Sequence, residues 1–358
     1  MEKIIICGND NQVKEIKERL TVQEHEIAVL DLNEKNFSED FFKTAAVFIA
    51  ADDSQENLIL GKMRLAGNDI KVINYSRFRN TSLENPIECI NNDIQYTGLI
   101  MGMSHSQCAI KSDLLTDNLY CNCAAPSMDI FCHLRYFKKL SEIHPEKLKS
   151  MRHIIIELPY YIFNFDLSRF GNFVYSKLNY FELIGDYHHF GKNYDQKNKI
   201  EEFKRFKQYF QPKKVAVKSS VNRNPLRKIA KKVLTNYRIA ANKDKVWRIL
   251  YQETIDENRK LWFELLGLLK RVCPKARVTV LIMPFNPIFR CFHKREIRKM
   301  KEVFMTSLGT EDFKILDHFD CINSVSFFDD HCHLNEKGAS KYTKILQEAL
   351  IREYRHNI

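Results

Sequence analysis

The pattern of apolar and polar positions divides the chain into alternating strand-like and helix-like segments. Short apolar runs of strand length alternate with stretches in which apolar residues recur every three or four positions. In the first part of the chain this pattern predicts strands at 3–7, 27–32, 45–51 and 70–75 and helices at 12–20 and 54–66. Strands that alternate with helices predict a parallel sheet covered by helices.

A second series of the same kind begins at Thr97. Its predicted strands are 99–103, 119–124, 153–158, 278–283 and 313–316, and its predicted helices lie near 128–141, 246–271, 290–306 and 335–354. Polar residues and Pro86 mark 78–96 as a junction between the two series. We therefore expect an α/β protein with two parallel-sheet α/β/α units. They are a small Rossmann-like domain over 1–90 and a larger domain over 97–358 with an insertion at about 165–245.

The composition is that of an ordinary globular protein. The chain has 358 residues, of which 44% are hydrophobic and 28% charged, and its 11 Gly and 9 Pro exclude a collagen-like or low-complexity chain. No apolar run approaches the roughly 18 residues of a membrane-spanning helix. The apolar part of the N-terminus is too short for a signal peptide. We therefore expect a cytoplasmic location.

The net charge of +11 is concentrated in one segment. Residues 191–245 contain 17 Lys and Arg against 4 Asp and Glu, whereas the rest of the chain has 39 against 41. Within this segment, 224–238 has helical periodicity, with an apolar stripe that includes Val233 and Tyr237 and is flanked by lysines and arginines. Such a helix fits either an anionic membrane surface on the inner face or a lid packed on the domain. No base-reading motif accompanies the charge, which argues against nucleic acid as a partner.

The first strand is followed by a turn that begins with Gly8. A dinucleotide fingerprint needs three glycines there, and only the first is present; Asp31 stands where a ribose-binding acid would be. This pattern resembles the small N-terminal domain of sugar-modifying acyltransferases, which can bind a nucleotide-sugar. The missing glycines favour a purely structural unit, so we expect no cofactor.

The ten cysteines do not form a disulfide pattern. The chain is long and carries no export signal, which favours reduced thiols. Cys121 and Cys123 form a C-x-C pair, and His331, Cys332 and His333 are adjacent, but no C-x-x-C pair is present. The sequence therefore predicts no metal site.

Two short motifs bring together the residue types of a serine nucleophile and its base. Ser104 follows Gly102 and Met103 at the carboxyl end of a predicted strand, where ligand sites of parallel sheets lie. Asp330 and His333 are three residues apart, just before the last predicted helix. A carboxylate beside an imidazole fixes its tautomer and frees the other ring nitrogen as a base. We therefore predict Ser104 as nucleophile, His333 as base and Asp330 as the group that orients it.

With these motifs the region 97–358, apart from the insertion, resembles the SGNH (GDSL-like) superfamily of hydrolases and acyltransferases. That superfamily has a Gly-x-Ser after the first strand and an Asp-x-x-His before a final helix. Segments 122–127 and 156–161 make the chain similar to the branch associated with bacterial surface-polysaccharide genes. The resemblance implies a flavodoxin-like fold and a Ser-His-Asp triad.

The chain departs from the family at the oxyanion hole. Ala124 and Ala125 stand where the family has a glycine, and the block after the third strand begins with Glu157 and contains no Asn. Asn122 or Ser127 could supply the missing donor. We interpret His105 and His331 as structural or substrate-facing. Three further polar residues are candidates for the rim of the site: Asn164, Asp166 and Arg169.

Together these observations lead us to expect a serine esterase or O-acyltransferase that acts on a carbohydrate, a cell-surface polysaccharide or its precursor. The alternative is a non-catalytic protein of the same fold that binds a nucleotide-sugar or a lipid-linked glycan. The altered oxyanion blocks favour the alternative, and the paired motifs favour the enzyme.

Overall fold

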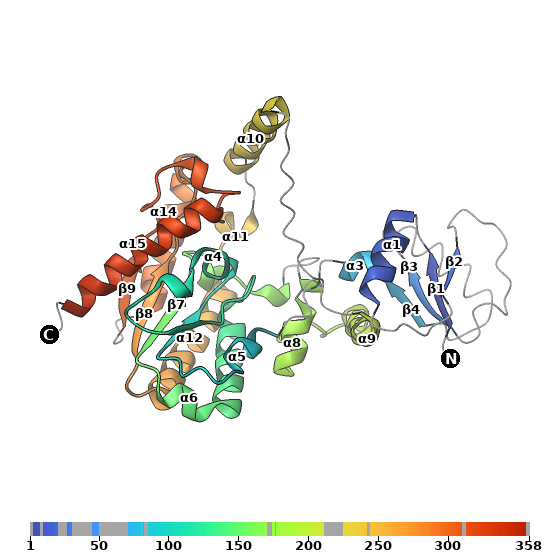
Figure 1. Ribbon diagram of the computed structural model, residues 1–358, viewed down its shortest axis with the longest axis horizontal. Coiled ribbons are helices and arrows are strands. Elements are labelled where there is room, and N and C mark those ends of the chain that lie inside the picture. Colours follow the sequence, from blue (N-terminus) through green and yellow to red (C-terminus); the bar gives the residue numbers. More distant parts are fainter. Residues whose placement is uncertain are drawn as a thin grey trace. The chain divides into compact units, whose positions relative to one another are not determined.

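The chain divides into two units in the computed structural model (Figure 1). One unit comprises Met1–Asn85 and Ser168–Val217, and the other comprises Pro86–Leu167 and Lys218–Ile358. The described residues are 3–7, 10–20, 27–30, 45–49, 71–79, 81, 85–169, 174–175, 177–210, 225–241, 244–309 and 313–355. Gly8, Asp31 and the predicted helix 54–66 lie outside them.

The first unit is built on a parallel sheet, as predicted. Its strands are β1 (Lys3–Cys7), β2 (Ile27–Leu30), β3 (Ala45–Ile49) and β4 (Lys71–Asn74), in the order β2-β1-β3-β4. The central strand β1 places three consecutive isoleucines in full burial, as a strand covered on both faces requires. Helices α1 (Asp10–Arg19) and α3 (Tyr75–Phe78) follow β1 and β4.

The first unit also contains helices from the segment that we expected to be an insertion of the second domain. These are α8 (Leu178–Ile184) and α9 (Tyr194–Tyr209). An aromatic face of α9 packs against α3 within this unit, with the ring of Phe206 5.2 Å from that of Phe78. The Glu202 carboxylate accepts the Asn74 N–H at 2.7 Å and the Arg77 guanidinium at 2.6 Å. The predicted insertion at 165–245 is therefore divided, and 168–217 belongs with the first unit because its helices complete that unit's core.

The second unit contains a parallel sheet with the flavodoxin-like strand order. Its strands are β5 (Gly98–Met101), β6 (Tyr120–Asn122), β7 (His153–Glu157), β8 (Arg277–Ile282) and β9 (Lys314–Asp317), in the order β6-β5-β7-β8-β9. This is the 2-1-3-4-5 arrangement, whose ligand sites lie where the chain reverses direction across the sheet. The α/β fold class with two parallel-sheet units is thus confirmed.

Helices cover both faces of this sheet (Figure 1). On one face α5 (Ile130–Ile143), α12 (Gln252–Val272) and α14 (Lys294–Leu308) pack together, with α6 (Pro145–Lys149) beside α5. On the other, α4 (Ser104–Ala109) packs on α15 (Glu336–Arg355), whose Tyr342 and Leu346 are fully buried. Short 3₁₀-helices complete the unit: η2 (Pro86–Ile90), η3 (Ser112–Leu114), η4 (Ile162–Asn164) and η6 (Val325–Phe327). A further one, η5 (Leu167–Arg169), spans the division between the units.

Two predicted helices are each interrupted. The helix expected at 246–271 is formed by α11 (Lys245–Arg248) and α12, because the backbone between them bonds elsewhere: Tyr251 N–H donates to Oδ1 of Asn164 at 2.8 Å. The helix expected at 290–306 begins earlier, as α13 (Pro287–Phe292), and restarts at α14. Asn286 caps α13 by accepting the Ile288 N–H at 2.9 Å.

The predicted basic helix is present as α10 (Pro225–Ala240), in the second unit. Its C-terminal end is anchored, since Ile239 is buried and α10 contacts α13. Val233 and Tyr237 are 63% and 70% exposed, so part of the apolar stripe faces solvent. Among the described residues, no helix is long and apolar enough to cross a membrane.

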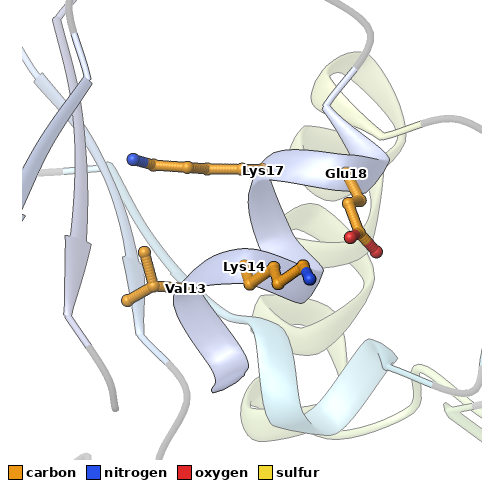
Figure 2. Close-up of a pocket in the computed structure, with 4 residues that line it drawn as sticks. All are labelled: Val13, Lys14, Lys17 and Glu18. Carbon is orange, nitrogen blue, oxygen red and sulfur yellow. The ribbon is translucent and has the colours of Figure 1, made fainter. Parts of the chain in front are cut away.

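A hollow on the first unit lies along α1 (Figure 2). It is lined by Val13, Lys14, Lys17 and Glu18. Surface lysines of this kind do not define a ligand by themselves. The three residues of the predicted triad all belong to the second unit.

Candidate active site

Ser104 stands where the flavodoxin-like order predicts a ligand site. It follows β5, whose neighbours are β6 on one side and β7 on the other, and it is the first residue of α4. The Gln107 N–H donates to the Met103 carbonyl at 3.1 Å, which closes the first helical turn around Ser104. Ser104 is only partly buried, so the turn fixes a residue that solvent still reaches.

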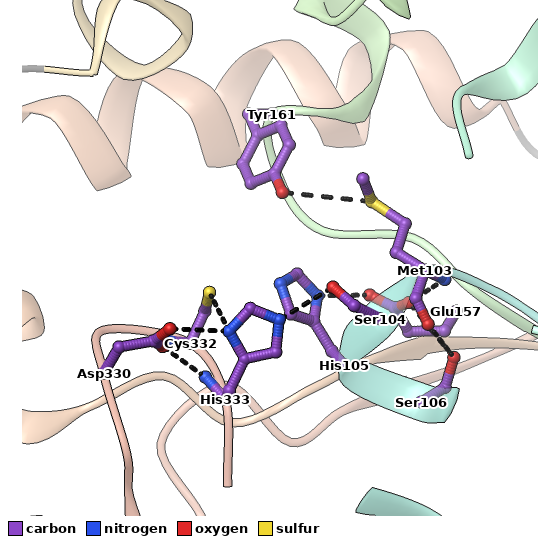
Figure 3. A network of polar contacts seen from close by, with 9 residues as sticks. All are labelled: Met103, Ser104, His105, Ser106, Glu157, Tyr161, Asp330, Cys332 and His333. Atoms are coloured by element: carbon purple, nitrogen blue, oxygen red, sulfur yellow. Dashed lines mark hydrogen bonds and ion pairs between the residues drawn. The ribbon is translucent and has the colours of Figure 1, made fainter. Parts of the chain in front are cut away.

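The structure brings Ser104, His333 and Asp330 together in one line (Figure 3). Ser104 Oγ lies 2.7 Å from Nε2 of His333, and Nδ1 of the same ring lies 2.7 Å from Oδ2 of Asp330. A proton on Nδ1, donated to Asp330, leaves Nε2 free to accept the serine hydroxyl proton. This is the geometry of a nucleophile, a general base and an orienting carboxylate.

The loop that carries the acid and the base is fixed by hydrogen bonds of its own. Oδ1 of Asp330 accepts the N–H groups of Cys332 at 2.8 Å and His333 at 2.7 Å. The Asp329 N–H donates to the His333 carbonyl at 2.9 Å, and Asn335 caps the following helix by accepting the Gly338 N–H at 3.0 Å. One carboxylate thus shapes the turn with one oxygen and orients the imidazole with the other.

The contact between Asp330 and His333 favours the charged form of each: it lowers the pKa of Asp330 and raises the pKa of His333. Burial alone would raise the pKa of Asp330, but the hydrogen bond and charge of His333 and two backbone N–H groups hold it well below its usual value. Burial would likewise lower the pKa of His333, but the hydrogen bond and charge of Asp330 outweigh it and raise that pKa. Asp330 therefore stabilises the imidazolium that forms when His333 takes a proton.

A buried carboxylate behind the serine was not predicted as a site residue. Glu157, at the end of β7, is fully buried and accepts the Met103 N–H at 2.7 Å, His105 Nδ1 at 3.0 Å and Ser106 Oγ at 3.3 Å (Figure 3). Burial would raise the pKa of Glu157, but the charge and hydrogen bond of His105 and the Met103 N–H hold it below its usual value. Glu157 therefore ties together the residues on both sides of Ser104. The signal in the sequence was an acidic residue directly after three consecutive isoleucines.

Gly102 is required by this arrangement. A Cβ atom at Gly102 would lie 2.1 Å from Ser106 Oγ and 2.8 Å from Glu157 Cβ. The glycine of the Gly-x-Ser motif thus makes room for the buried carboxylate beneath the nucleophile turn.

The two expected oxyanion donors occupy different settings. The Asn122 amide donates to the carbonyls of Ser106 and Ile110, both at 3.3 Å, and its Oδ1 accepts the Ala124 N–H at 3.1 Å. It therefore holds the end of α4 to the end of β6. Ser127 is buried and has a φ of 64°, in the left-handed region that non-glycine residues rarely adopt.

His105, His331 and Cys332, which lie close to the triad, are held by packing and hydrogen bonds. His105 is bonded to Glu157, and its ring lies 5.2 Å from that of His333. His331 packs its ring 5.5 Å from that of Phe289. Burial and Asp330 raise the pKa of the Cys332 thiol well above its usual value, so this thiol stays protonated at neutral pH. His105, Cys332 and His333 offer three ligand atoms close together, but both ring nitrogens of His333 are already engaged by Ser104 and Asp330.

Aromatic side chains pack beside the triad. The Tyr161 hydroxyl reaches Met103 Sδ at 3.9 Å, and its ring lies 5.1 Å from that of Trp247 on α11. Trp247 is buried and lies 5.5 Å from Phe285, whose ring is 5.7 Å from that of His105. These rings form a continuous aromatic cluster from Met103 to His105, on the two sides of Ser104.

Asn164 and Arg169, which we expected at the rim of the site, make their hydrogen bonds to residues outside the triad. Asn164 is buried, and its amide donates to the Val246 and Ile249 carbonyls at 2.8 and 2.7 Å. It therefore holds the connection between α11 and α12. Arg169 falls in the first unit, where its Nε donates to His189 at 3.3 Å. Asp166 is buried in the second unit.

Comparison with known proteins identifies no family for this chain. No protein-family model matches the chain, and no curated protein matches it. A solved structure described as "a putative platelet activating factor from Streptococcus pneumonia" is similar at 10% identity and a TM-score of 0.36, over 84% of this chain and 100% of that one. A likeness this weak carries no statement about activity.

Proposed function

We propose that this protein is a serine esterase or O-acyltransferase of the SGNH type. The observation that carries the proposal is the continuous contact from Ser104 Oγ through the His333 ring to Asp330, with 2.7 Å at each step. Two motifs 229 residues apart in the chain meet in this contact. A serine at a helix start and a histidine in a loop could meet by chance packing. Such packing would give no reason for a carboxylate on the other ring nitrogen, where Asp330 lies.

The proposed reaction has two steps. Ser104 Oγ attacks the acyl carbonyl carbon while His333 Nε2 takes the hydroxyl proton, and the backbone N–H of Ser104 helps to hold the oxyanion. His333 then gives its proton to the departing alkoxide, which leaves an acyl group on Ser104. Water or a second hydroxyl, deprotonated by His333, then attacks this ester and takes the acyl group. The bond from the acyl carbon to Ser104 Oγ breaks, and His333 returns the proton to that oxygen.

The substrate class is proposed from the resemblance to the surface-polysaccharide branch. It is a carbohydrate or glycolipid that carries an ester-linked acyl group. The exposed stripe of α10, with Val233, Leu234 and Tyr237 between basic residues, supports an additional proposal. This helix binds an anionic membrane surface, which is where a lipid-linked glycan would be found.

Covalent labelling tests the proposed nucleophile. A fluorophosphonate probe should label the folded wild-type protein at one residue, and Ser104→Ala should abolish the labelling. Ser112→Ala, in η3, is the matched control and should label like wild type. Absence of labelling in the folded protein would favour a binding protein with the same fold instead.

A further inference from the structure

Three cysteine thiols converge at the edge of the second unit's sheet. Cys89 lies in η2, Cys121 on the edge strand β6 and Cys123 directly after it. The Sγ of Cys89 is 2.8 Å from that of Cys123 and 3.5 Å from that of Cys121, and Cys121 and Cys123 are 3.6 Å apart. Each sulfur is therefore in contact with both others.

The backbone explains why the three sulfurs meet. Cys121 and Cys123 are two positions apart in an extended segment, so their side chains share one face, and Asn122 between them points to α4 on the other. Buried Ile87 and Ile90 anchor η2, which places Cys89 over that shared face. The C-x-C pair in the sequence thus gains its third member from a segment about 30 residues earlier.

All three positions are held by hydrogen bonds of the backbone. Cys121 is paired with Leu99 in the sheet, and the Cys123 N–H donates to the Ile100 carbonyl at 2.8 Å. The Asn92 amide donates to the Cys89 carbonyl at 3.0 Å. The Lys147 ammonium donates to the Ile90 carbonyl at 2.9 Å, which fixes the end of η2. A ligand of this cluster would therefore find its donors already in place.

The spacing fits a thiophilic metal ion. A tetrahedral ion with bonds of about 2.3 Å to sulfur separates its ligands by about 3.8 Å. Two of the three distances are within a few tenths of this value, and the third would open by about 1 Å. A disulfide uses two thiols and would leave the third without a role. Thiolate sulfur is the ligand that zinc(II) and copper(I) prefer.

We propose that Cys89, Cys121 and Cys123 bind one thiophilic metal ion, zinc(II) or copper(I). Each cysteine gives up its proton and contributes one sulfur ligand, and a zinc ion takes its fourth ligand from water or another small molecule. Among the described residues, no other His, Cys, Asp or Glu joins this group. The ion ties η2 to the edge strand and is independent of the proposed acyl chemistry.

Metal titration of the reduced full-length protein tests the proposal. After chelation, cobalt(II) should bind at one equivalent with a sulfur-to-cobalt charge-transfer band, and zinc(II) should displace it. A parallel anaerobic titration with copper(I) against a chromogenic chelator distinguishes the two ions. For the ion that binds more tightly, Cys89→Ser should lower the affinity by about 100-fold or more. Cys291→Ser, at an exposed cysteine of α13, should leave the affinity unchanged.

A second measurement does not depend on the variants. Bound metal should protect the half-buried Cys89 of the wild-type protein from alkylation, as read by peptide mass spectrometry. The proposal is overturned if the folded, reduced wild type binds neither ion, or if binding is unchanged in Cys89→Ser. A wild-type protein that loses two hydrogens as a Cys89–Cys123 disulfide, and takes up no metal once reduced, would instead show a redox pair.

Discussion

Asp330 holds His333 in two ways at once. Its Oδ2 lies 2.7 Å from the imidazole Nδ1, while its Oδ1 accepts the backbone N–H of His333 at 2.7 Å. The same carboxylate therefore fixes the ring's tautomer and the position of the residue that carries the ring. Charge and geometry can be separated here, because an amide keeps the oxygen that caps the turn and loses the negative charge.

Asp330→Asn should fold like the wild type and lose most of its reactivity. The amide oxygen can still accept the two backbone N–H groups, but it no longer stabilises the imidazolium or selects the productive tautomer. We expect the second-order rate constant of fluorophosphonate labelling to fall by about 10⁴-fold. Asp329→Asn, at the exposed neighbouring position, is the control and should label normally. Labelling of Asp330→Asn at the wild-type rate would show that Asp330 does not support the base.

The labelling rate should rise with pH through the pKa of His333, because only the neutral ring can accept the serine proton. Burial opposes the charged form, but Asp330 outweighs it and raises this pKa. The midpoint should therefore lie above the ordinary value of about 6.5. In Asp330→Asn the midpoint should shift to lower pH.

The same shift has a consequence for stability with the opposite pH trend. Because the folded pKa of His333 is raised, the ion pair's contribution is complete below the unfolded value of about 6.5 and is lost as pH rises through the folded value. Thermal unfolding of wild type and Asp330→Asn across this range measures that loss. An unchanged difference in melting temperature from pH 5 to pH 9 would contradict the linkage.

The elements around the nucleophile could be predicted because each depends on local sequence. The apolar runs before Gly102 and before Glu157 favour strands whichever strand they pair with. The final helix is amphipathic over its whole length. The meeting of Ser104 with His333 follows from one further rule, that loops at the carboxyl ends of parallel strands lie at one edge.

What could not be predicted depends on pairings between distant segments. Glu157 was noted only as a departure from the family's block, because its partner His105 becomes visible only when β7 lies beside β5. The third cysteine of the cluster was missed for the same reason. The division of the predicted insertion depends on which sheet the aromatic face of α9 packs against. The periodicity of α9 predicts an apolar face but not the sheet that this face contacts.

Glu157 should be essential for the stability of the nucleophile turn. Glu157→Ala leaves the Met103 N–H and the His105 ring buried without their shared acceptor, and we expect a loss of about 3–5 kcal/mol in the free energy of unfolding. Glu157→Gln keeps the shape and one acceptor oxygen and should cost less. Chemical denaturation of the two variants gives the comparison. Equal stabilities of wild type and Glu157→Ala would mean that the carboxylate is not buried as described.

The basic residues of α10 should determine binding to anionic vesicles. Reversing Lys228, Lys231 and Lys232 to Glu should weaken binding to phosphatidylserine-containing vesicles by at least about 100-fold, since each basic residue near such a surface contributes about 1 kcal/mol. Vesicle sedimentation at two salt concentrations measures the effect. Reversal of Lys294, Arg295 and Lys299 on α14 changes the net charge equally and should leave binding intact. Binding that survives the α10 reversal would exclude this helix as the membrane contact.

Gly102 and Gly267 give a matched pair of glycine substitutions with opposite expected signs. At Gly102 a methyl group would overlap Ser106 Oγ and Glu157 Cβ, and both neighbours are buried and held by hydrogen bonds. Gly102→Ala must therefore displace the carboxylate that supports Ser104. It should lower the free energy of unfolding by about 1–3 kcal/mol and slow labelling as well.

At Gly267, within α12, the nearest atom to an added Cβ is an Arg271 guanidinium nitrogen at 3.5 Å, which is an ordinary contact. Gly267→Ala should stabilise the protein by about 0.5–1 kcal/mol, because alanine loses less backbone entropy in a helix, and it should label at the wild-type rate. Denaturant unfolding and probe labelling of both variants separate a local effect at the nucleophile turn from a general effect of filling a glycine. If Gly102→Ala retained wild-type stability and reactivity, Glu157 would not lie against the turn, and the proposed support for the nucleophile would fail with it.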